Sequence, residues 1–209
     1  MEISDEKWLE WIDQMAEEDH VIIDDFLEES LYLKIKDFFD IKRADDAFQK
    51  ASIGALSNNQ IVNEIRGDYT YWLDPQQDHH LEDFFDLVEN CKAIFNRYCF
   101  LSLSGYEFHL AFYPIGSFYK RHVDQFKDRS NRMITFILYF NETWEEGDGG
   151  ELKIYLKDKS NKIIAPLRNR AVMFRSADLP HEVLPTHKGR ASLTGWFLYQ
   201  PPEVGYLFG

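Results

Sequence analysis

The sequence predicts a mainly β fold, a sandwich or jelly roll, with α-helices packed outside it. Two observations predict this class. Residues 1–100 contain stretches whose apolar residues recur at helical spacing, whereas residues 105–200 contain short stretches rich in β-branched and aromatic residues, separated by turns. Such a succession of short strands is typical of a sandwich or jelly roll. The 209 residues show no internal repeat or linker composition, so we expect a single domain over residues 1–209.

Residues 1–100 are expected to form mostly helical support. The stretch SDEKWLEWIDQMAEED opens with a Ser4 or Asp5 cap, and its apolar residues recur every three or four positions. EESLYLKIKDFFD and LEDFFDLVENCKAIFNRYCF repeat this pattern. We therefore expect helices over residues 4–19, 28–40 and 81–100, an apolar strand over 21–26, and short strands with polar turns over 48–80.

Eight strands are expected after residue 105. They are the stretches YEFHLAFY, SFYKRHVD, RMITFILYFN, GELKIYL, KIIAPL, RAVMFR, HEVLP and ASLTGWFLY. The run Gly147–Asp148–Gly149–Gly150 could cradle a phosphate group, but no helix follows it. We expect a hairpin turn there instead.

The charge of the chain disfavours nucleic acid as a partner. The formal net charge is -13, and residues 1–50 alone carry 16 Asp and Glu against 6 Lys and Arg. Binding to a phosphate backbone requires a basic surface. The acidic region could attract a basic protein, or it could serve only as a solubilising surface.

Cysteine usage and hydropathy predict a cytoplasmic protein. Cys91 and Cys99 lie eight residues apart in one expected helix, which places them roughly 12 Å apart, too far for a disulfide. No apolar run approaches the ~18 residues of a membrane span. The acidic N-terminus lacks the apolar region of a secretory signal, so we expect no membrane partner.

A pair of polar residues in strand-like sequence suggests a metal site. In YKRHVDQF, His122 and Asp124 are two positions apart, so on a strand they point to the same side. Alone, this pattern could be a solvated strand face. His181, however, begins another expected strand 57 residues after Asp124. In a jelly roll the second and seventh strands are neighbours, so the three side chains can converge.

Two imidazoles and a carboxylate form the facial triad of non-haem Fe(II) sites, which leaves coordination positions open. Arg190 begins the next expected strand and shares a face with Ser192, Thr194 and Trp196, because these residues are spaced by two. Its planar guanidinium suits a carboxylate. A five-carbon keto dicarboxylate would use both features, with its keto acid end on iron and its far carboxylate on Arg190.

Several ordered blocks of sequence resemble one enzyme family. RHVDQF, GGELKIY, LPHEV and GRASLTGWF, in that order and spacing, resemble the 2-oxoglutarate and Fe(II)-dependent dioxygenases of the prolyl 4-hydroxylase type. Upstream, IRGDYTYWL, FYPIGSFYKRH and FILYFNETW are similar to the oxygen-sensing protein prolyl hydroxylases of animals and their bacterial relatives. The likeness covers about residues 60–200. The expected core is then a double-stranded β-helix (jelly roll) over residues 105–200.

The resemblance implies the roles of the central residues. Iron ligands are implied at His122, Asp124 and His181. A 2-oxoglutarate carboxylate is implied on Arg190, assisted by the hydroxyl of Tyr139. The alternatives are a salt bridge at the rim for Arg190 and a core position for Tyr139.

The resemblance also implies roles for residues around this centre. Tyr113 matches a tyrosine that lines the co-substrate pocket, and Thr194 matches a polar residue near the metal. Arg66, Asp68 and Trp72 match a segment at the entrance where the peptide lies. Alternatively, Arg66 and Asp68 form an ion pair that only steadies a loop. We expect His109, in an alternating strand, and His187, in a turn, to be structural.

The expected function follows from the resemblance. It implies Fe(II), 2-oxoglutarate and O₂, with ascorbate returning oxidised iron to the ferrous state. We expect hydroxylation of a prolyl residue in another protein, with release of succinate and CO₂. One alternative is the same chemistry on another side chain, a free amino acid or a small metabolite. Another is a jelly-roll binding module that kept its metal and lost turnover, against which Arg190 argues.

Overall fold

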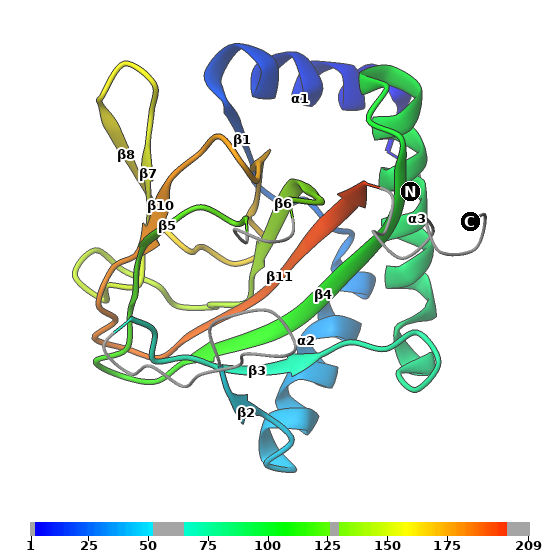
Figure 1. The fold of residues 1–209 in the computed structure, drawn as a ribbon. Coiled ribbons are helices and arrows are strands. Elements are labelled where there is room, and N and C mark those ends of the chain that lie inside the picture. The colour runs from blue at the N-terminus through cyan, green and yellow to red at the C-terminus, as the bar shows by residue number, and fades with distance from the viewer. Residues whose placement is uncertain (1–2, 52–64, 126–129, 200–209) are drawn as a thin grey trace, which may run out of the picture.

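The structure is a computed structural model that describes residues 3–51, 65–125 and 130–199 (Figure 1). The first residues of the upstream likeness, 60–64, and the final segment, 200–209, lie outside these ranges. Within them, no helix is both long enough and apolar enough to cross a bilayer. Cys91 and Cys99 are both free, as expected from their spacing.

The three expected helices are present. Ser4 caps the first, because its hydroxyl accepts a hydrogen bond from the Lys7 backbone N–H at 3.3 Å. The second helix continues past its expected end at Asp40, since Ile41–Ala44 contains no helix breaker and the basic Lys42 and Arg43 suit a helix C-terminus. The helices are α1 (Asp5–Glu18), α2 (Glu29–Ala44) and α3 (Glu82–Cys99), with a short 3-10 helix, η1 (His79–Leu81), before α3.

Two antiparallel sheets form the core, and all eight strands expected after residue 105 are present. The larger sheet has the order β1-β9-β6-β11-β4-β3-β2, and the smaller one β5-β10-β7-β8. The strands of the larger sheet are β1 (His20–Ile23), β2 (Gln49–Lys50), β3 (Tyr69–Trp72), β4 (Leu103–Tyr113), β6 (Arg132–Tyr139), β9 (Ala171–Arg175) and β11 (Arg190–Tyr199). Those of the smaller sheet are β5 (Tyr119–His122), β7 (Leu152–Tyr155), β8 (Asn161–Ile164) and β10 (His181–Val183).

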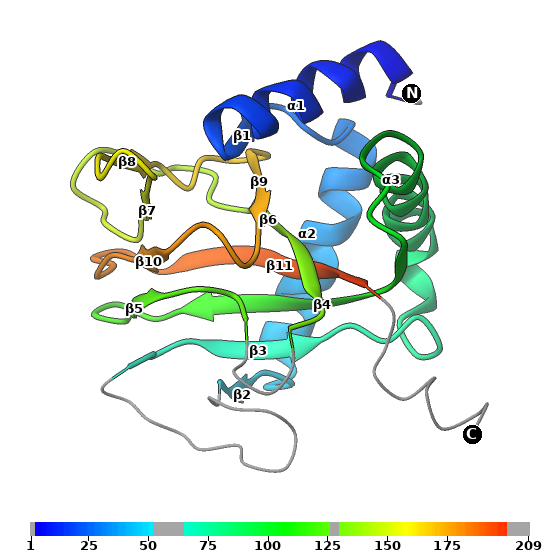
Figure 2. The same cartoon turned by 45° about the horizontal axis from the view of Figure 1, so that its top comes forward.

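The middle of the larger sheet is buried on both faces, as the alternation of side chains in β6 shows. Ile134, Phe136 and Leu138 belong to a core shared with buried residues of all three helices. Ile137 and Tyr139 point the other way, into a second core with residues of β7, β8 and β9. Figures 1 and 2 show the result: the helices lie along one side and the small sheet on the other. The jelly roll with flanking helices is therefore confirmed.

Two local expectations were wrong. The strand expected over residues 21–26 ends at Ile23, because Asp25 adopts a left-handed conformation (φ 50°) that turns the chain. The glycine run at 147–150 is not a hairpin, because β6 and β7 belong to different sheets. It carries the chain from one layer to the other, and Gly147, Gly149 and Gly150 all have positive φ.

Candidate metal and co-substrate site

The smaller sheet brings the two candidate histidines together. His122 ends β5 and His181 begins β10, and their Cα atoms are register partners in an antiparallel pair. Asp124 follows two residues after β5, where its backbone N–H donates to the Ser176 carbonyl at 3.1 Å. The second and seventh strands after residue 105 are thus neighbours, as the jelly roll predicted.

Each imidazole is held in one tautomer by a backbone carbonyl. His122 Nδ1 lies 2.7 Å from the Lys120 oxygen, and His181 Nδ1 lies 3.0 Å from the Leu179 oxygen. A carbonyl only accepts, so each Nδ1 carries the proton and each Nε2 keeps a free lone pair. The two Nε2 atoms lie 3.4 Å and 3.5 Å from the oxygens of Asp124.

Buried hydroxyls hold the carboxylate in place. Thr135 Oγ1 donates to Asp124 Oδ2 at 2.9 Å, and the same hydroxyl oxygen lies 2.9 Å from Ser176 Oγ. Thr135 and Ser176 have no exposed surface. Such partners behind a metal ligand fix its orientation.

The electrostatics of the site favour deprotonated donors. Burial opposes ionisation of Asp124, but interactions with His181 and His122, when these rings are protonated, and with the Arg132 guanidinium outweigh it and hold the pKa of this carboxyl well below its usual range. Burial also lowers the pKa of His181, which favours the neutral ring. A metal ion needs ligands in these deprotonated forms.

The three side chains therefore fit a metal ion. Their ligand atoms all lie within 4.8 Å of one another. Two imidazoles and one carboxylate on one side of an ion match the donor set of non-haem Fe(II) sites. His122 and His181 would hold the iron through Nε2, and Asp124 would hold it through a carboxylate oxygen.

Arg190 lies in a buried socket that fits a carboxylate. It is 3% exposed, its Nη1 donates to Ser192 Oγ at 3.1 Å, and its guanidinium carbon lies 4.8 Å and 5.0 Å from the ring centres of Tyr113 and Tyr139. Among the described residues, neither Arg190 Nε nor the Tyr139 hydroxyl has a hydrogen-bond partner. Unpaired buried polar atoms are costly, so a ligand carboxylate between them would relieve that cost.

The sheet register places the residues of this socket. Tyr113 of β4 is the register partner of Arg190, and Tyr139 of β6 is that of Ser192. Burial raises the pKa of both tyrosines, so their hydroxyls stay protonated and able to donate. Thr194, half-buried, continues the same side of β11. The co-substrate roles of Tyr113, Tyr139 and Thr194 stay predictions.

Arg66 and Asp68 form the ion pair that was one of the two expectations for them. Arg66 Nε and Nη2 donate to the two oxygens of Asp68 at 2.8 Å and 2.6 Å, and Asp68 is fully buried. The Arg66 guanidinium also lies 4.5 Å from the centre of the Tyr119 ring, which stacks on His122 at 3.7 Å. The pair is therefore connected through one aromatic ring to a candidate iron ligand.

Trp72 and His109 form part of an aromatic wall. Trp72 is 51% exposed, and its ring lies 4.8 Å from that of His109, which lies 5.4 Å from the ring of Trp196. We expected His109 to be structural. The structure places it on the same side of β4 as Tyr113, and its register partner in β11 is Thr194. Burial lowers the pKa of His109 to about 3, so the ring is neutral.

The sequence reasoning missed three residues of the site: Tyr119, Thr135 and Ser176. Thr135 could have been found, because it is a polar residue inside the apolar run RMITFILYF. Tyr119 lies three positions before His122, which gives only a weak signal. Ser176 carries none, since its contact with Thr135 depends on how two distant segments pack. His187, expected in a turn, donates its backbone N–H to the Asp148 carbonyl.

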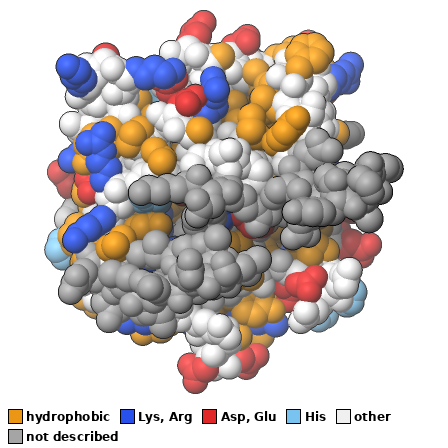
Figure 3. All heavy atoms as spheres, viewed as in Figure 1, with side chains coloured by type: hydrophobic (Ala, Val, Ile, Leu, Met, Phe, Trp, Pro, Cys, Tyr) orange, Lys and Arg blue, Asp and Glu red, His pale blue; other side chains and the backbone are white. Residues whose placement is uncertain are grey.

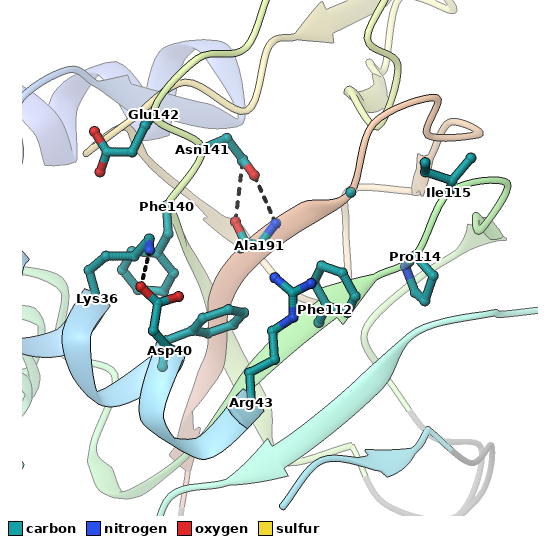
Figure 4. A pocket seen from close by; sticks show the side chains of 12 residues that line it. Lys36, Asp40, Arg43, Phe112, Pro114, Ile115, Phe140, Asn141, Glu142 and Ala191 are labelled. Carbon is teal, nitrogen blue, oxygen red and sulfur yellow. Dashed lines mark hydrogen bonds and ion pairs between the residues drawn. The ribbon is translucent and has the colours of Figure 1, made fainter. Parts of the chain in front are cut away.

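A separate hollow of about 660 Å³ lies outside this site (Figure 4). It is bounded by α2, by Phe112 and by Ala191, and it contains none of the three candidate ligands. Its charged groups are already engaged: Lys36 pairs with Asp40, and the Arg43 guanidinium lies 3.8 Å from the Phe112 ring centre. This hollow therefore contributes no residue to the candidate metal site.

Comparison with known proteins gives a consistent result. Residues 108–198 match the 2OG-Fe(II) oxygenase superfamily, a range that contains the triad and Arg190. A hypoxia-inducible factor prolyl hydroxylase of Caenorhabditis elegans is 31% identical over 148 residues, which cover 66% of this chain. The chain spans only 20% of that relative's length.

Solved structures extend the likeness to nearly the whole chain. A prolyl-4-hydroxylase of Pseudomonas putida is 32% identical with a TM-score of 0.83, and the match covers 91% of this chain and 98% of that one. A prolyl hydroxylase of Trichoplax adhaerens, solved with a peptide fragment of the hypoxia inducible factor oxygen degradation domain, is 26% identical with a TM-score of 0.82. That match covers 93% of this chain and 90% of the other.

Proposed function

The chain belongs to the 2OG-Fe(II) oxygenase superfamily, as a member of its prolyl 4-hydroxylase type, and from this we propose that it hydroxylates a prolyl residue of a protein substrate. The observation that carries the proposal is that one jelly roll contains both a group of metal donors and a buried arginine able to bind a carboxylate. Three metal donors lie within 4.8 Å of one another, and a buried arginine without a carboxylate partner among the described residues lies on the neighbouring sheet.

The residues divide the work as follows. Bound Fe(II) supplies the oxidising chemistry, in which 2-oxoglutarate and O₂ yield succinate, CO₂ and a hydroxylated substrate. His122, Asp124 and His181 hold the metal, and Thr135 keeps the carboxylate oriented. Arg190 binds the far carboxylate of 2-oxoglutarate, so the keto acid end is directed to the metal.

The surroundings of the site favour a polypeptide substrate. Trp72 offers a half-exposed ring beside His109, and the buried Asp68 anchors the segment that carries it. Nucleic acid is disfavoured by the net charge of -13. On the face seen in Figure 3, the described basic and acidic side chains are interspersed and do not form a continuous basic stripe.

A panel of substrates tests the proposal. The enzyme, Fe(II) and 2-oxoglutarate are incubated with proline-containing peptides, the same peptides with alanine for proline, and free proline. We expect succinate release above background, and hydroxyproline, with the proline peptides alone. Hydroxylation of alanine peptides or of free proline would redirect the proposal to another side chain or a small molecule.

The absence of any succinate with every substrate and with cell lysate would support a metal-binding module without turnover. The intact Arg190 socket argues against that outcome, because a binding module without a co-substrate has no use for an unpaired buried arginine.

A further inference from the structure

The socket of Arg190 has a wall made of backbone. Residues 148–151 run beside residues 184–188, which lead into Arg190. The Gly150 N–H donates to the Pro185 carbonyl at 3.2 Å, the Leu184 N–H to Glu151 at 3.0 Å, and the His187 N–H to Asp148 at 2.7 Å. This segment is therefore fixed against the start of β11.

Gly150 lies directly against the arginine side chain. A Cβ atom at Gly150 would lie 3.1 Å from Arg190 Cδ and 3.4 Å from Arg190 Cβ and Thr186 Cβ. The 3.1 Å distance is tight for a carbon–carbon contact, which is most favourable at ≈ 3.5–4.0 Å, whereas 3.4 Å is close to ordinary contact. A Cβ at residue 150 would therefore require Arg190 Cδ to move by a few tenths of an ångström.

Few polar contacts among the described residues fix the position of the Arg190 side chain. Its guanidinium has one hydrogen bond, to Ser192, and its Nε has no partner among the described residues. The rings of Tyr113 and Tyr139 flank it. The direction in which the guanidinium points thus depends on how the side chain packs between these rings and Gly150.

We propose that Gly150 is a positioning residue for the co-substrate: its missing side chain lets Arg190 lie at the distance from the metal that 2-oxoglutarate requires. The inference rests on the proposed function, because it assumes that Arg190 binds the far carboxylate. It assigns to Gly150 a role in co-substrate recognition, which a connection between two sheets does not by itself require.

The chain supplies a matched control in the same loop. Gly147 and Gly150 both have positive φ, +100° and +75°, so an alanine at either position is strained in the backbone. A Cβ atom at Gly147, however, would meet nothing within 4 Å. The pair Gly147→Ala and Gly150→Ala therefore separates backbone strain from contact with Arg190.

The measurement is calorimetric titration of the Mn(II)-loaded protein with 2-oxoglutarate and with pyruvate, which lacks the far carboxylate. We expect Gly150→Ala to bind 2-oxoglutarate about three- to tenfold more weakly, the cost of moving one side chain off its rotamer. Pyruvate affinity should stay within about twofold in both variants, and Gly147→Ala should bind both keto acids like the wild type.

A double-mutant cycle tests whether Gly150 acts through Arg190. In the Arg190→Ala background, Gly150→Ala should cause no further loss of 2-oxoglutarate affinity. If Gly150→Ala alone fails to fold, Gly150→Ala combined with Arg190→Ala should fold, because truncation removes the tight 3.1 Å contact with Arg190 Cδ and leaves only contacts of 3.4 Å.

Unchanged 2-oxoglutarate affinity in Gly150→Ala would overturn the inference, and so would an equal loss of affinity for 2-oxoglutarate and for pyruvate. It would also be overturned if Gly150→Ala lowered 2-oxoglutarate affinity by the same factor in the Arg190→Ala background, or if the double variant stayed unfolded. These outcomes differ from a failure of the proposed function. If the 2-oxoglutarate-dependent chemistry is absent, the wild-type protein itself will not bind 2-oxoglutarate more tightly than pyruvate. If only the prolyl substrate is wrong, the wild type will bind 2-oxoglutarate and release succinate without forming hydroxyproline.

Discussion

At the scale of single residues, the site depends on which polar atoms already have a hydrogen-bond partner in the protein and which remain available to a ligand. The Nδ1 atoms of His122 and His181 are used by backbone carbonyls, so only their Nε2 atoms face Asp124. Arg190 is the reverse case, since burial leaves its guanidinium with a single described hydrogen bond. A metal ion would use the free Nε2 atoms, and a ligand carboxylate would pair with the guanidinium.

Asp124 is the most direct test of the metal centre. Asp124→Ala should abolish both divalent metal binding and turnover, because it removes the only charged donor among the three ligands. Metal content and calorimetric titration with Mn(II) measure the first effect, and succinate release measures the second. Asp83→Ala, which removes an exposed partner of Lys34, is the control and should bind metal normally. Retained metal and turnover in Asp124→Ala would contradict the assignment.

Arg190 separates an oxygenase from a plain metal-binding jelly roll. Truncating one partner of a buried charge pair costs about 2–5 kcal/mol, so Arg190→Ala should keep its metal but bind 2-oxoglutarate about 30-fold or more weakly. Arg190→Lys should be intermediate, because an ammonium keeps the charge but loses the planar fork. Pyruvate binding should be largely indifferent to either change. Unchanged affinity for 2-oxoglutarate in Arg190→Ala would mean that another residue is the anchor.

At the scale of elements, the pairing of β5 with β10 creates the site, and the larger sheet completes it. The small sheet supplies both imidazoles, while β11, β4 and β6 supply Arg190 and its tyrosines. The segment from Arg66 through β3 closes another side, held by the buried Asp68 carboxylate. Three sequence-distant segments thus meet around one centre.

Trp72 of β3 tests the entrance role of this segment. Trp72→Ala should reduce substrate turnover more than it reduces decarboxylation of 2-oxoglutarate without substrate, because the ring is half-exposed beside the wall and contacts no candidate metal ligand in the described contacts. The measurement is succinate release with and without a proline peptide. Phe100→Ala removes an exposed ring at the end of α3 and should change neither rate. Equal loss of both rates in a folded Trp72→Ala protein would make the segment structural.

His20, at the start of β1, gives the fold a pH dependence away from the site. Its Nδ1 lies 2.8 Å from the Glu18 carbonyl and its Nε2 lies 3.1 Å from Lys162 Nζ, with Glu18 and Asp19 nearby. Burial, more than any other influence, lowers the pKa of His20. The neutral form is therefore favoured in the folded state, so this contribution to stability is present above the unfolded pKa, about 6.5, and is lost as the pH falls below it.

Denaturant unfolding at pH 7 and pH 5 tests this sign. The free energy of unfolding should fall more for the wild type than for His20→Gln between these two values, because glutamine cannot be protonated. His80→Gln, at an exposed position, should behave like the wild type. A fall of equal size in wild type and His20→Gln would remove His20 as the cause.

At the scale of the whole molecule, the strands and the grouping of the three candidate metal ligands could be predicted, whereas some of the pairings could not. Alternation in the strands is local, so the spacing of His122 and Asp124 already put them on one side. The partnership with His181 required the jelly-roll order, which the strand count and the resemblance supplied. The connection at Gly147–Gly150 was mistaken for a hairpin because local turn residues do not specify the sheet to which the next strand belongs.

The unpredicted contacts share one physical cause. His109 lies in an alternating strand, and only the packing of β3 and β11 on either side places it between Trp72 and Trp196. The support of Asp124 by Thr135 and Ser176 likewise joins three separate segments. Contacts of this kind depend on tertiary packing, which the period of a sequence does not encode.

The central claim is that the chain hydroxylates proline in a protein, and mapping modified peptides in a lysate tests it most directly. Cell lysate is incubated with Fe(II), 2-oxoglutarate and either the wild-type enzyme or Asp124→Ala, and its peptides are then sequenced by mass spectrometry. The account predicts peptides that gain the mass of one oxygen atom on a prolyl residue with the wild type and not with Asp124→Ala. The account would be contradicted if the wild-type enzyme released succinate but added oxygen only to residues other than proline, or to no residue at all.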